Sequence, residues 1–350
     1  MYRLVQRRGI IGLFCLLFVA SSVVPGWAQK DNRFEVSKNL DIFNSLLKEV
    51  EMFYVDSVDV DKTVQRGIEA MLAGLDPYTE YYPEQKTEEL SLMTTGEYGG
   101  IGSLIRQRNN EGGVMIAEPT EGMPADLAGL KPGDLILAID TIDVSKATNS
   151  RVSELLKGVP NTKMVLTIQR PGEKKPRKFE ITRKQITTPQ VTYYGVKNDS
   201  IGYIYLKAFT IKSAQEVKEA FLDLKKNHNI KSLVLDLRGN GGGVLEGAVQ
   251  IVGMFVPKGS EVLSTKGKIK QWDRTYRTST EPLDTVMPLA ILINGGTASA
   301  AEIVSGSLQD MDRAVLVGQR SFGKGLVQAP RDLPYNGKVK ITMSKYYIPS

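Results

Sequence analysis

Hydrophobic and polar positions follow three different patterns along the chain. Over residues 36–56 and 64–75, apolar side chains recur at the three- and four-residue spacing of an amphipathic helix. Asp76 and Pro77 come next, and proline disfavours helical backbone in the residue before it. We therefore predict two helices within an N-terminal helical region of residues 29–95.

The second pattern consists of short β-like runs separated by turns. They suggest a compact module of residues 96–185. The predicted strands are residues 102–105, 114–117, 135–139, 165–168 and 179–182, and the predicted short helices lie near residues 125–128 and 149–157.

From residue 186 onward, continuous apolar runs alternate with helical stretches, which predicts an α/β core with a mostly parallel sheet. The polar stretch between Gly259 and Ser279, with Trp272 and Tyr276, predicts a hairpin or flap. The expected strands are residues 201–206, 232–237, 289–294 and 314–317, and the expected helices are residues 213–227, 244–256 and 299–309.

Residues 1–28 have the anatomy of an export signal. Three arginines precede an apolar run from Ile10 to Ala20, and small residues stand before a cleavage point after Ala28. The alternative is an uncleaved membrane anchor, which leaves membrane proximity open, although the run is shorter than the ~20 residues that span a bilayer. We expect an exported protein, periplasmic in a bacterium.

Composition limits the chemistry that the mature chain can perform. Loss of the signal removes Cys15 and three arginines, so the formal charge falls from +6 to +3 and nucleic-acid binding gains no support. Without cysteine there is no thiol nucleophile or disulfide. His228 is the one histidine, at the expected end of a helix, so a clustered-histidine zinc site is excluded. No metal or cofactor is predicted, and a nucleophile needs a base other than His or Cys.

Three glycine-rich segments follow strands of the predicted parallel sheet. They are residues 238–243 (Arg-Gly-Asn-Gly-Gly-Gly), 295–302 (Gly-Gly-Thr-Ala-Ser-Ala-Ala-Glu) and 318–328. Ligands and catalytic groups gather outside the carboxyl ends of such strands, so we expect all three segments at one edge.

Ser299 is the candidate nucleophile because it opens a helix directly after a glycine-rich turn. The N–H of Ala300 points toward the same space, and the N–H of Gly242 is the second expected oxyanion donor. Two alternatives stay open. Ser299 and Glu302 have the spacing of a capping box. Residues 241–243 are compatible with a nucleotide loop, although they lack the third glycine of the dinucleotide fingerprint and the Gly-Lys-Ser/Thr of a P-loop.

Lys324 is the candidate general base. An ordinary lysine pKa of ~10.4 leaves almost no neutral amine at pH 7, so burial has to lower the pKa by roughly three units. We expect Phe322, Leu326 and Val327 to form the apolar surroundings and Gln328 to hold the amine. The alternative is a solvated loop lysine.

The module of residues 96–185 resembles a PDZ domain. Residues 123–134 (Met-Pro-Ala-Asp-Leu-Ala-Gly-Leu-Lys-Pro-Gly-Asp) match the signature of bacterial PDZ domains. Gly99, Gly100, Ile101 and Gly102 stand where that family has its carboxylate-binding loop. The resemblance implies capture of peptide C-termini through backbone N–H groups and a strand edge.

Nearly the whole chain after the signal resembles the C-terminal processing (tail-specific) serine proteases. The resemblance rests on residues 75–79 (Leu-Asp-Pro-Tyr-Thr), 236–243, 296–302 and 323–328, together with the PDZ signature, in the family's order. It implies a crotonase-like core with an inserted PDZ domain, in which Ser299 is nucleophile, Lys324 base and Gln328 orienting residue, with oxyanion donors at Gly242 and Ala300.

The resemblance also suggests gating by the PDZ domain and a homodimer, which the N-terminal helices would form. Gly239 and Gly241 depart from the family's commoner Asn and Pro. The family pattern continues past Ser350, so the protease core of residues 186–350 is expected to be incomplete at its C-terminal end. The competing hypothesis is a non-catalytic periplasmic adaptor that uses the PDZ groove to hold tails.

Overall fold

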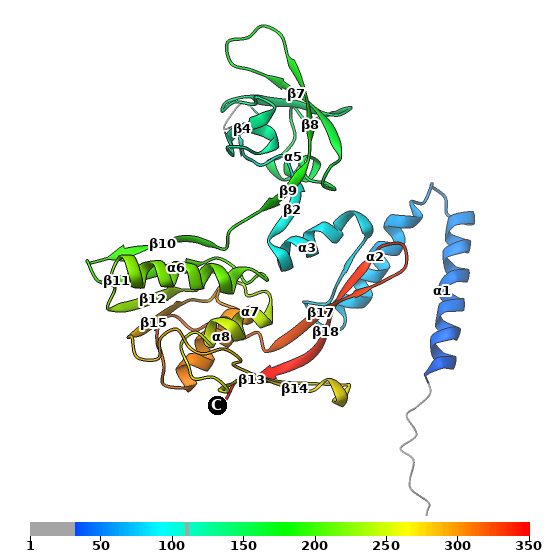
Figure 1. The fold of residues 1–350 in the computed structure, drawn as a ribbon. Helices are drawn as coiled ribbons and strands as arrows, with labels where there is room; N and C mark the ends of the chain where they lie inside the picture. The colour runs from blue at the N-terminus through cyan, green and yellow to red at the C-terminus, as the bar shows by residue number, and fades with distance from the viewer. Residues whose placement is uncertain (1–31, 109–111) are drawn as a thin grey trace, which may run out of the picture. The chain divides into compact units, whose positions relative to one another are not determined.

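The computed structural model describes residues 32–108 and 112–350 (Figure 1). The chain divides into two compact units, Met1–Ile68 and Glu69–Ser350. The expected export signal lies outside the described residues. Among the helices that the structure describes, none has the length and apolar character needed to cross a membrane.

The first unit contains α1 (Arg33–Phe53) and the beginning of α2 (Val60–Ala73). Both predicted helices are confirmed, with α1 starting three residues earlier than expected. No residue of α1 is buried, and Leu40, Phe43 and Leu46 on this helix are 63%, 47% and 58% exposed.

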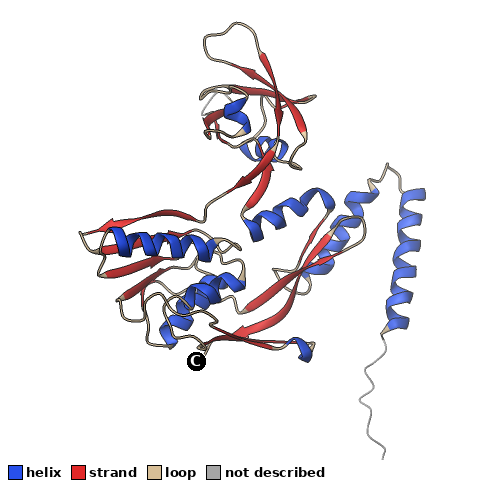
Figure 2. Cartoon of the chain, viewed as in Figure 1, coloured by secondary structure: helices blue, strands red, loops and turns tan. Residues whose placement is uncertain are grey.

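The PDZ module is built on an antiparallel sheet in the order β3-β4-β5-β7-β8, with β6 paired to β5. Figure 2 shows the strands of the chain in red and its helices in blue. Its apolar core comes from alternating strand positions and from α5, whose first turn is capped by Thr148. The elements are β3 (Ser103–Gln107), β4 (Val114–Pro119), α4 (Pro124–Leu127), β5 (Leu135–Ile139), β6 (Ile142–Asp143), α5 (Asn149–Leu156), β7 (Lys163–Gln169) and β8 (Arg177–Thr182).

The strands that enter and leave this module pair with each other. β2 (Glu97–Gly100) runs antiparallel to β9 (Lys184–Thr187), with Glu97 opposite Thr187. Before β2 come β1 (Glu80–Tyr82), the short 3₁₀ helix η1 (Glu84–Lys86) and α3 (Thr87–Thr95). Because the module's two chain ends lie together, it forms an insertion between β1 and the strands of the core.

The core contains a second sheet in the order β10-β11-β12-β15-β16. All neighbours from β11 to β16 are parallel, and only β10 runs antiparallel. The predicted α/β class is confirmed. The elements are β10 (Val191–Lys197), β11 (Ile201–Leu206), α6 (Ser213–Asn227), β12 (Ser232–Asp236), α7 (Leu245–Val252), β15 (Leu289–Ile293), α8 (Ala300–Asp310) and β16 (Val315–Gly318).

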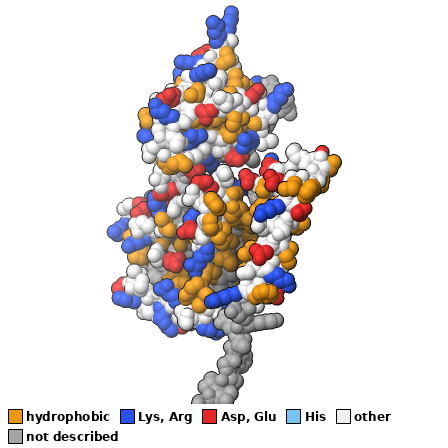
Figure 3. Space-filling model, turned by 90° about the vertical axis from the view of Figure 1, so that its right-hand side faces the viewer, with side chains coloured by type: hydrophobic (Ala, Val, Ile, Leu, Met, Phe, Trp, Pro, Cys, Tyr) orange, Lys and Arg blue, Asp and Glu red, His pale blue; other side chains and the backbone are white. Residues whose placement is uncertain are grey.

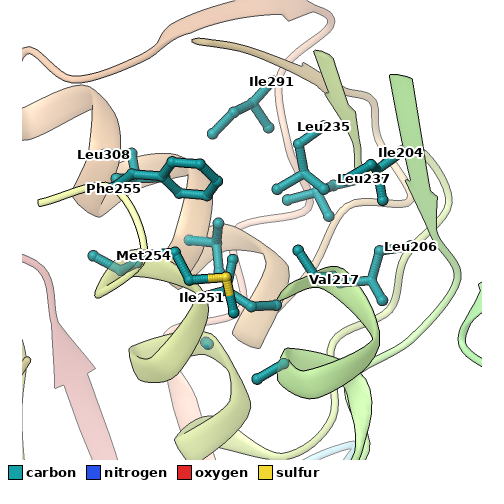
Figure 4. Packing of buried hydrophobic residues seen from close by; sticks show 14 of the residues in the cluster. Ile204, Leu206, Val217, Leu235, Leu237, Ile251, Met254, Phe255, Ile291 and Leu308 are labelled. Carbon is teal, nitrogen blue, oxygen red and sulfur yellow. The ribbon is translucent and has the colours of Figure 1, made fainter. Parts of the chain in front are cut away.

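One face of this parallel sheet carries the main hydrophobic core. Alternate residues of the strands pack against apolar side chains of α6, α7 and α8 (Figure 4). Phe255, beyond the end of α7, meets Phe221 of α6 edge to face, with ring centroids 5.5 Å apart. The opposite face of the sheet is less buried, as the alternating burial of β11 shows.

A third sheet, antiparallel, joins distant parts of the core. Its order is β1-β18-β13-β14, and β17 pairs with β18. The hairpin expected between Gly259 and Ser279 is present as β13 (Glu261–Gly267), the 3₁₀ helix η2 (Lys270–Trp272) and β14 (Arg274–Arg277). β17 (Leu326–Asp332) and β18 (Lys338–Tyr347) complete the sheet. The sequence predicted only the β13–β14 hairpin of this sheet, which also brings β1 beside β18.

Candidate active site

Ser299 occupies a strained turn immediately before α8. Its φ of 56° and ψ of −118° are unusual for a residue that carries a side chain, and such a conformation costs roughly 1–3 kcal/mol. Strained turns between a strand and a helix expose the nucleophilic hydroxyl of many hydrolases. Ser299 is only partly buried, so solvent and substrate can reach it.

The carboxylate of Glu302 connects the serine to the lysine loop. Its Oε2 accepts the backbone N–H groups of Ser299 at 2.8 Å and of Lys324 at 2.9 Å. Its Oε1 accepts the Ser321 hydroxyl at 2.8 Å and the Gly323 N–H at 2.6 Å. The capping box expected from the sequence is therefore present. The same glutamate fixes the position of the lysine's backbone.

Further hydrogen bonds hold the three glycine-rich segments together. The N–H of Phe322 donates to the Thr297 carbonyl, and the N–H of Ala298 donates to the Asn240 carbonyl, both at 2.9 Å. The Thr297 hydroxyl donates to the carbonyl of Leu237 at 2.8 Å. The prediction that these segments meet at one edge of the parallel sheet is confirmed.

Gly242 lies directly against the nucleophile. A Cβ at this position, where φ is +93°, would stand 2.7 Å from the Ser299 Cβ and 2.9 Å from the Ala300 nitrogen, so only glycine fits without a shift. The N–H of Gly242, however, donates to Asn240 Oδ1 at 2.9 Å. Both proposed oxyanion donors are thus beside Ser299, and use of the Gly242 donor requires exchange of the bond to Asn240.

Lys324 is half-buried, and its Nζ lies 4.3 Å from the ring centroid of Tyr78. Burial lowers the pKa of the Lys324 amine and the positive charge of Lys340 lowers it further, while Glu80, Asp76 and Glu302 raise it. The net direction is the one that a lysine base requires.

The surroundings of Lys324 differ from those predicted. Phe322 is 56% exposed and so provides little apolar cover, and Tyr78 takes that place. Within residues 32–108 and 112–350, no hydrogen bond joins the Lys324 side chain to Ser299 or Gln328. Proton transfer from Ser299 to Lys324 requires a hydrogen bond that is not formed in this arrangement.

Gln328 belongs to a hydrogen-bond network that leads to Asp76 and does not include the Lys324 amine. Its Nε2 donates to Thr342 Oγ1 at 3.2 Å. The Thr342 N–H donates to Thr79 Oγ1 at 3.1 Å, and the Thr79 hydroxyl donates to Asp76 Oδ2 at 2.8 Å. Its role in orienting Lys324 stays a prediction. Asp76 and Thr79 belong to the sequence motif of residues 75–79. The motif alone did not indicate that they contact Thr342.

The expected carboxylate-binding loop of the PDZ module is partly a strand. Gly99 and Gly100 lie in β2, and the N–H of Gly99 donates to Glu88 Oε1 of α3 at 2.6 Å. Ile101 and Gly102 follow as the turn, and Gly102, with a φ of +67°, lies against Met123. The peptide-binding role of these four residues stays a prediction, and only the last two have loop backbone.

Comparison with known proteins defines the class. Residues 200–350 match the model of peptidase family S41, and residues 115–170 match that of the PDZ domain. The chain belongs to peptidase family S41 and is a serine-type peptidase with a PDZ domain. The presence of a PDZ domain and of a protease core is confirmed, while the bounds predicted for them stay a prediction.

Within that family, the similarity is to the C-terminal processing proteases. The chain is 36% identical over 338 residues to a carboxy-terminal-processing protease of Bartonella bacilliformis, covering 96% of this chain and 76% of that protein. It is 33% identical over 315 residues to a probable CtpA-like serine protease of Staphylococcus aureus, covering 89% of this chain and 62% of the relative. The solved photosystem II D1 C-terminal processing protease is 29% identical over 89% of both chains, with a TM-score of 0.48. The predicted family is confirmed.

Proposed function

We propose that the protein is an endopeptidase that captures C-terminal tails of proteins through its PDZ domain and cleaves by a Ser/Lys acyl-enzyme mechanism. The observation that carries the proposal is the Glu302 carboxylate, which accepts the N–H groups of both Ser299 and Lys324 on one oxygen. One rigid group thus sets the separation of the nucleophile's backbone from that of the base.

In the proposed mechanism, Lys324 in its neutral form takes the proton of the Ser299 hydroxyl as Oγ attacks the scissile carbonyl carbon. The N–H groups of Ala300 and Gly242 donate hydrogen bonds to the developing oxyanion. For Gly242 this requires that its hydrogen bond to Asn240 Oδ1 first breaks. The protonated amine of Lys324 then gives its proton to the leaving nitrogen as the peptide C–N bond breaks. Water, activated by the same lysine, attacks the acyl-enzyme ester and frees Ser299. Gln328 orients the lysine amine.

The test uses the full chain and an unfolded substrate protein with an apolar C-terminal tail. Ser299→Ala and Lys324→Ala should each lower cleavage by at least about 10³-fold, as loss of a nucleophile or its base does. Ser305→Ala and Lys345→Ala are matched controls, because the Ser305 hydroxyl donates to the backbone carbonyls of Ala301 and Glu302 within α8 and Lys345 is exposed. Undiminished cleavage by either site variant would contradict the mechanism. Tail binding without cleavage, and without labelling of Ser299 by a serine-reactive phosphonate, would favour the adaptor.

Two further features belong to the proposal. Export to the periplasm with cleavage after Ala28 is supported by the charged and apolar pattern of residues 1–28. N-terminal sequencing of the exported protein should give Gln29 as its first residue, and an intact Met1 would indicate an anchored, membrane-associated form. A homodimer formed through the N-terminal helices is supported by the exposed apolar residues of α1.

A further inference from the structure

Residues 76–82 reach the lysine site from a distant part of the sequence. β1 pairs antiparallel with β18, with Glu80 opposite Lys340 and Tyr82 opposite Lys338. β18 in turn pairs with β17, which begins two residues after Lys324. These pairings place the turn before β1 beside Lys324, although the turn lies more than 200 residues earlier in the sequence.

The turn that carries Tyr78 is held rigidly. Asp76 Oδ1 accepts the N–H groups of Tyr78 at 2.7 Å and of Thr79 at 2.9 Å. Pro77 restricts the backbone between them. Thr79 is 5% exposed and its Oγ1 accepts the N–H of Thr342 on β18 at 3.1 Å. The Tyr78 backbone is therefore fixed from both sides.

The aromatic ring of Tyr78 lies against the Lys324 amine. The 4.3 Å separation is well inside the ~6 Å range of a cation–π interaction. The charged groups that act on Lys324 are Asp76 and Glu80 beside the turn, Lys340 on β18 and Glu302 on α8. Among the described residues, none of the three carboxylates forms an ion pair with it.

Contact with an aromatic ring rather than with a carboxylate affects how easily the Lys324 amine loses its proton. A carboxylate in contact with the amine would stabilise the ammonium form strongly and oppose its use as a base. An aromatic face attracts the ammonium by only about 0.5–2 kcal/mol and also excludes water from that side. A ring can therefore hold the amine in place while the ammonium group can still lose its proton.

We propose that Tyr78 is a positioning residue for Lys324, whose ring holds the amine within the site between its encounters with Ser299. The inference rests on the proposed function, because it requires Lys324 to be the base. The hydroxyl of Tyr78 has no part in it, and the ring face is what matters.

The experiment compares Tyr78→Leu, which removes the ring, with Tyr78→Phe, which keeps it. Tyr81→Leu serves as control, since it removes a tyrosine of the same segment that, among the described residues, has no hydrogen bond or cation–π contact with Lys324. In steady-state cleavage by the full chain, Tyr78→Leu should lower kcat about 10-fold or more while KM changes less than about 2-fold. Tyr78→Phe should stay within about 3-fold of the parent, and Tyr81→Leu should be unchanged.

A second series guards against a variant that fails to fold. Phenylalanines carrying increasing numbers of fluorine atoms, placed at residue 78, keep the ring shape but weaken its attraction for a cation. The inference predicts a stepwise fall in kcat with fluorination. A flat series overturns it, as does a Tyr78→Phe variant that is as impaired as Tyr78→Leu.

Failure of this inference is distinguishable from failure of the proposed function. If Lys324→Ala and Ser299→Ala retain activity, the Ser/Lys mechanism is wrong and Tyr78 has no base to position. If both abolish cleavage while the Tyr78 variants behave as the parent, the mechanism stands and the positioning role is wrong.

Discussion

At the scale of single residues, Ser299 has two roles that the sequence presented as alternatives. As an N-cap residue it lies in a capping box with Glu302, and as a candidate nucleophile it stands in a strained turn. The Glu302 carboxylate reconciles them because it accepts the N–H of the strained residue and also holds the loop of Lys324. Charge-assisted hydrogen bonds of this kind are stronger than neutral ones and can offset part of the strain.

Replacing Glu302 by glutamine tests this double role. The amide keeps one oxygen acceptor but turns an NH₂ group toward backbone N–H donors, so at least one donor loses its partner. We expect kcat to fall about 10-fold or more and the free energy of unfolding to fall by about 1–3 kcal/mol. Peptidase assays and urea unfolding measure the two effects. Glu246→Gln, at an exposed residue in the first turn of α7, should alter neither. A Glu302→Gln enzyme with parental kcat would show that the carboxylate does not organise the site.

At the scale of elements, local patterns were sufficient for most helices and strands. The bounds of α6 match the prediction of residues 213–227, because its apolar face and its start and end are all encoded nearby. The helix predicted to end at residue 256 ends instead at Val252, and Gly253 follows as its C-cap. The apolar residues from there to Val256 are buried in the core, so their pattern gave no sign of the helix end.

Apart from the β13–β14 hairpin, the antiparallel sheet of β1, β18, β13 and β14 could not be predicted in this way. Pairing of Glu80 with Lys340 joins segments with no local relation, and such contacts leave no periodic signal in either segment. The neighbours of Lys324 were missed for the same reason. Burial of the lysine was expected from residues beside it in sequence. Tyr78, which contacts the amine, lies instead far earlier in the sequence, before the PDZ module.

Asp284 connects the loop before β15 to helix α6. Although burial disfavours its charge, hydrogen bonds from Lys225 of α6 and from the N–H groups of Met287 and Val286 lower its pKa to about 2. A lowered pKa in the folded state contributes stability above the unfolded pKa, and that contribution is lost as pH falls through the folded pKa. For this shift it is about 2 kcal/mol at pH 7 and about half of that at pH 3.

The expected outcome for Asp284→Asn is a loss of about 2 kcal/mol in the free energy of unfolding at pH 7, which becomes smaller as pH falls from 4 to 3. Urea unfolding of parent and variant across this range measures the difference. Asp312→Asn is a control, since no ion pair of the described residues involves Asp312. A deficit that is the same at pH 7 and pH 3 would show that the carboxylate's charge is not its cause.

At the scale of the whole molecule, the protease core is assembled from both sides of the PDZ insertion. β1 precedes the insertion and pairs with β18, near the end of the chain, while the β2–β9 ribbon brings the insertion's entry and exit together. The lysine site therefore needs segments from before and after the PDZ module. Hydrophobic side chains are also exposed in groups on the molecular surface (Figure 3), and exposed apolar groups of this kind often mark contacts with other chains.

The apolar residues of α1 make the proposed dimer testable. Leu40 and Phe43 are three positions apart and lie on one side of the helix, and both are exposed. Burying such side chains against a second copy contributes about 25 cal/mol per Å² of apolar surface. Leu40→Glu with Phe43→Glu should therefore convert a dimer to a monomer in sedimentation velocity. Lys38→Gln with Ser45→Glu makes the same change in net charge on the opposite side of α1, where both residues are exposed, and should leave the dimer intact. A monomeric parent, or a double variant that still dimerises, would remove α1 as the dimer contact.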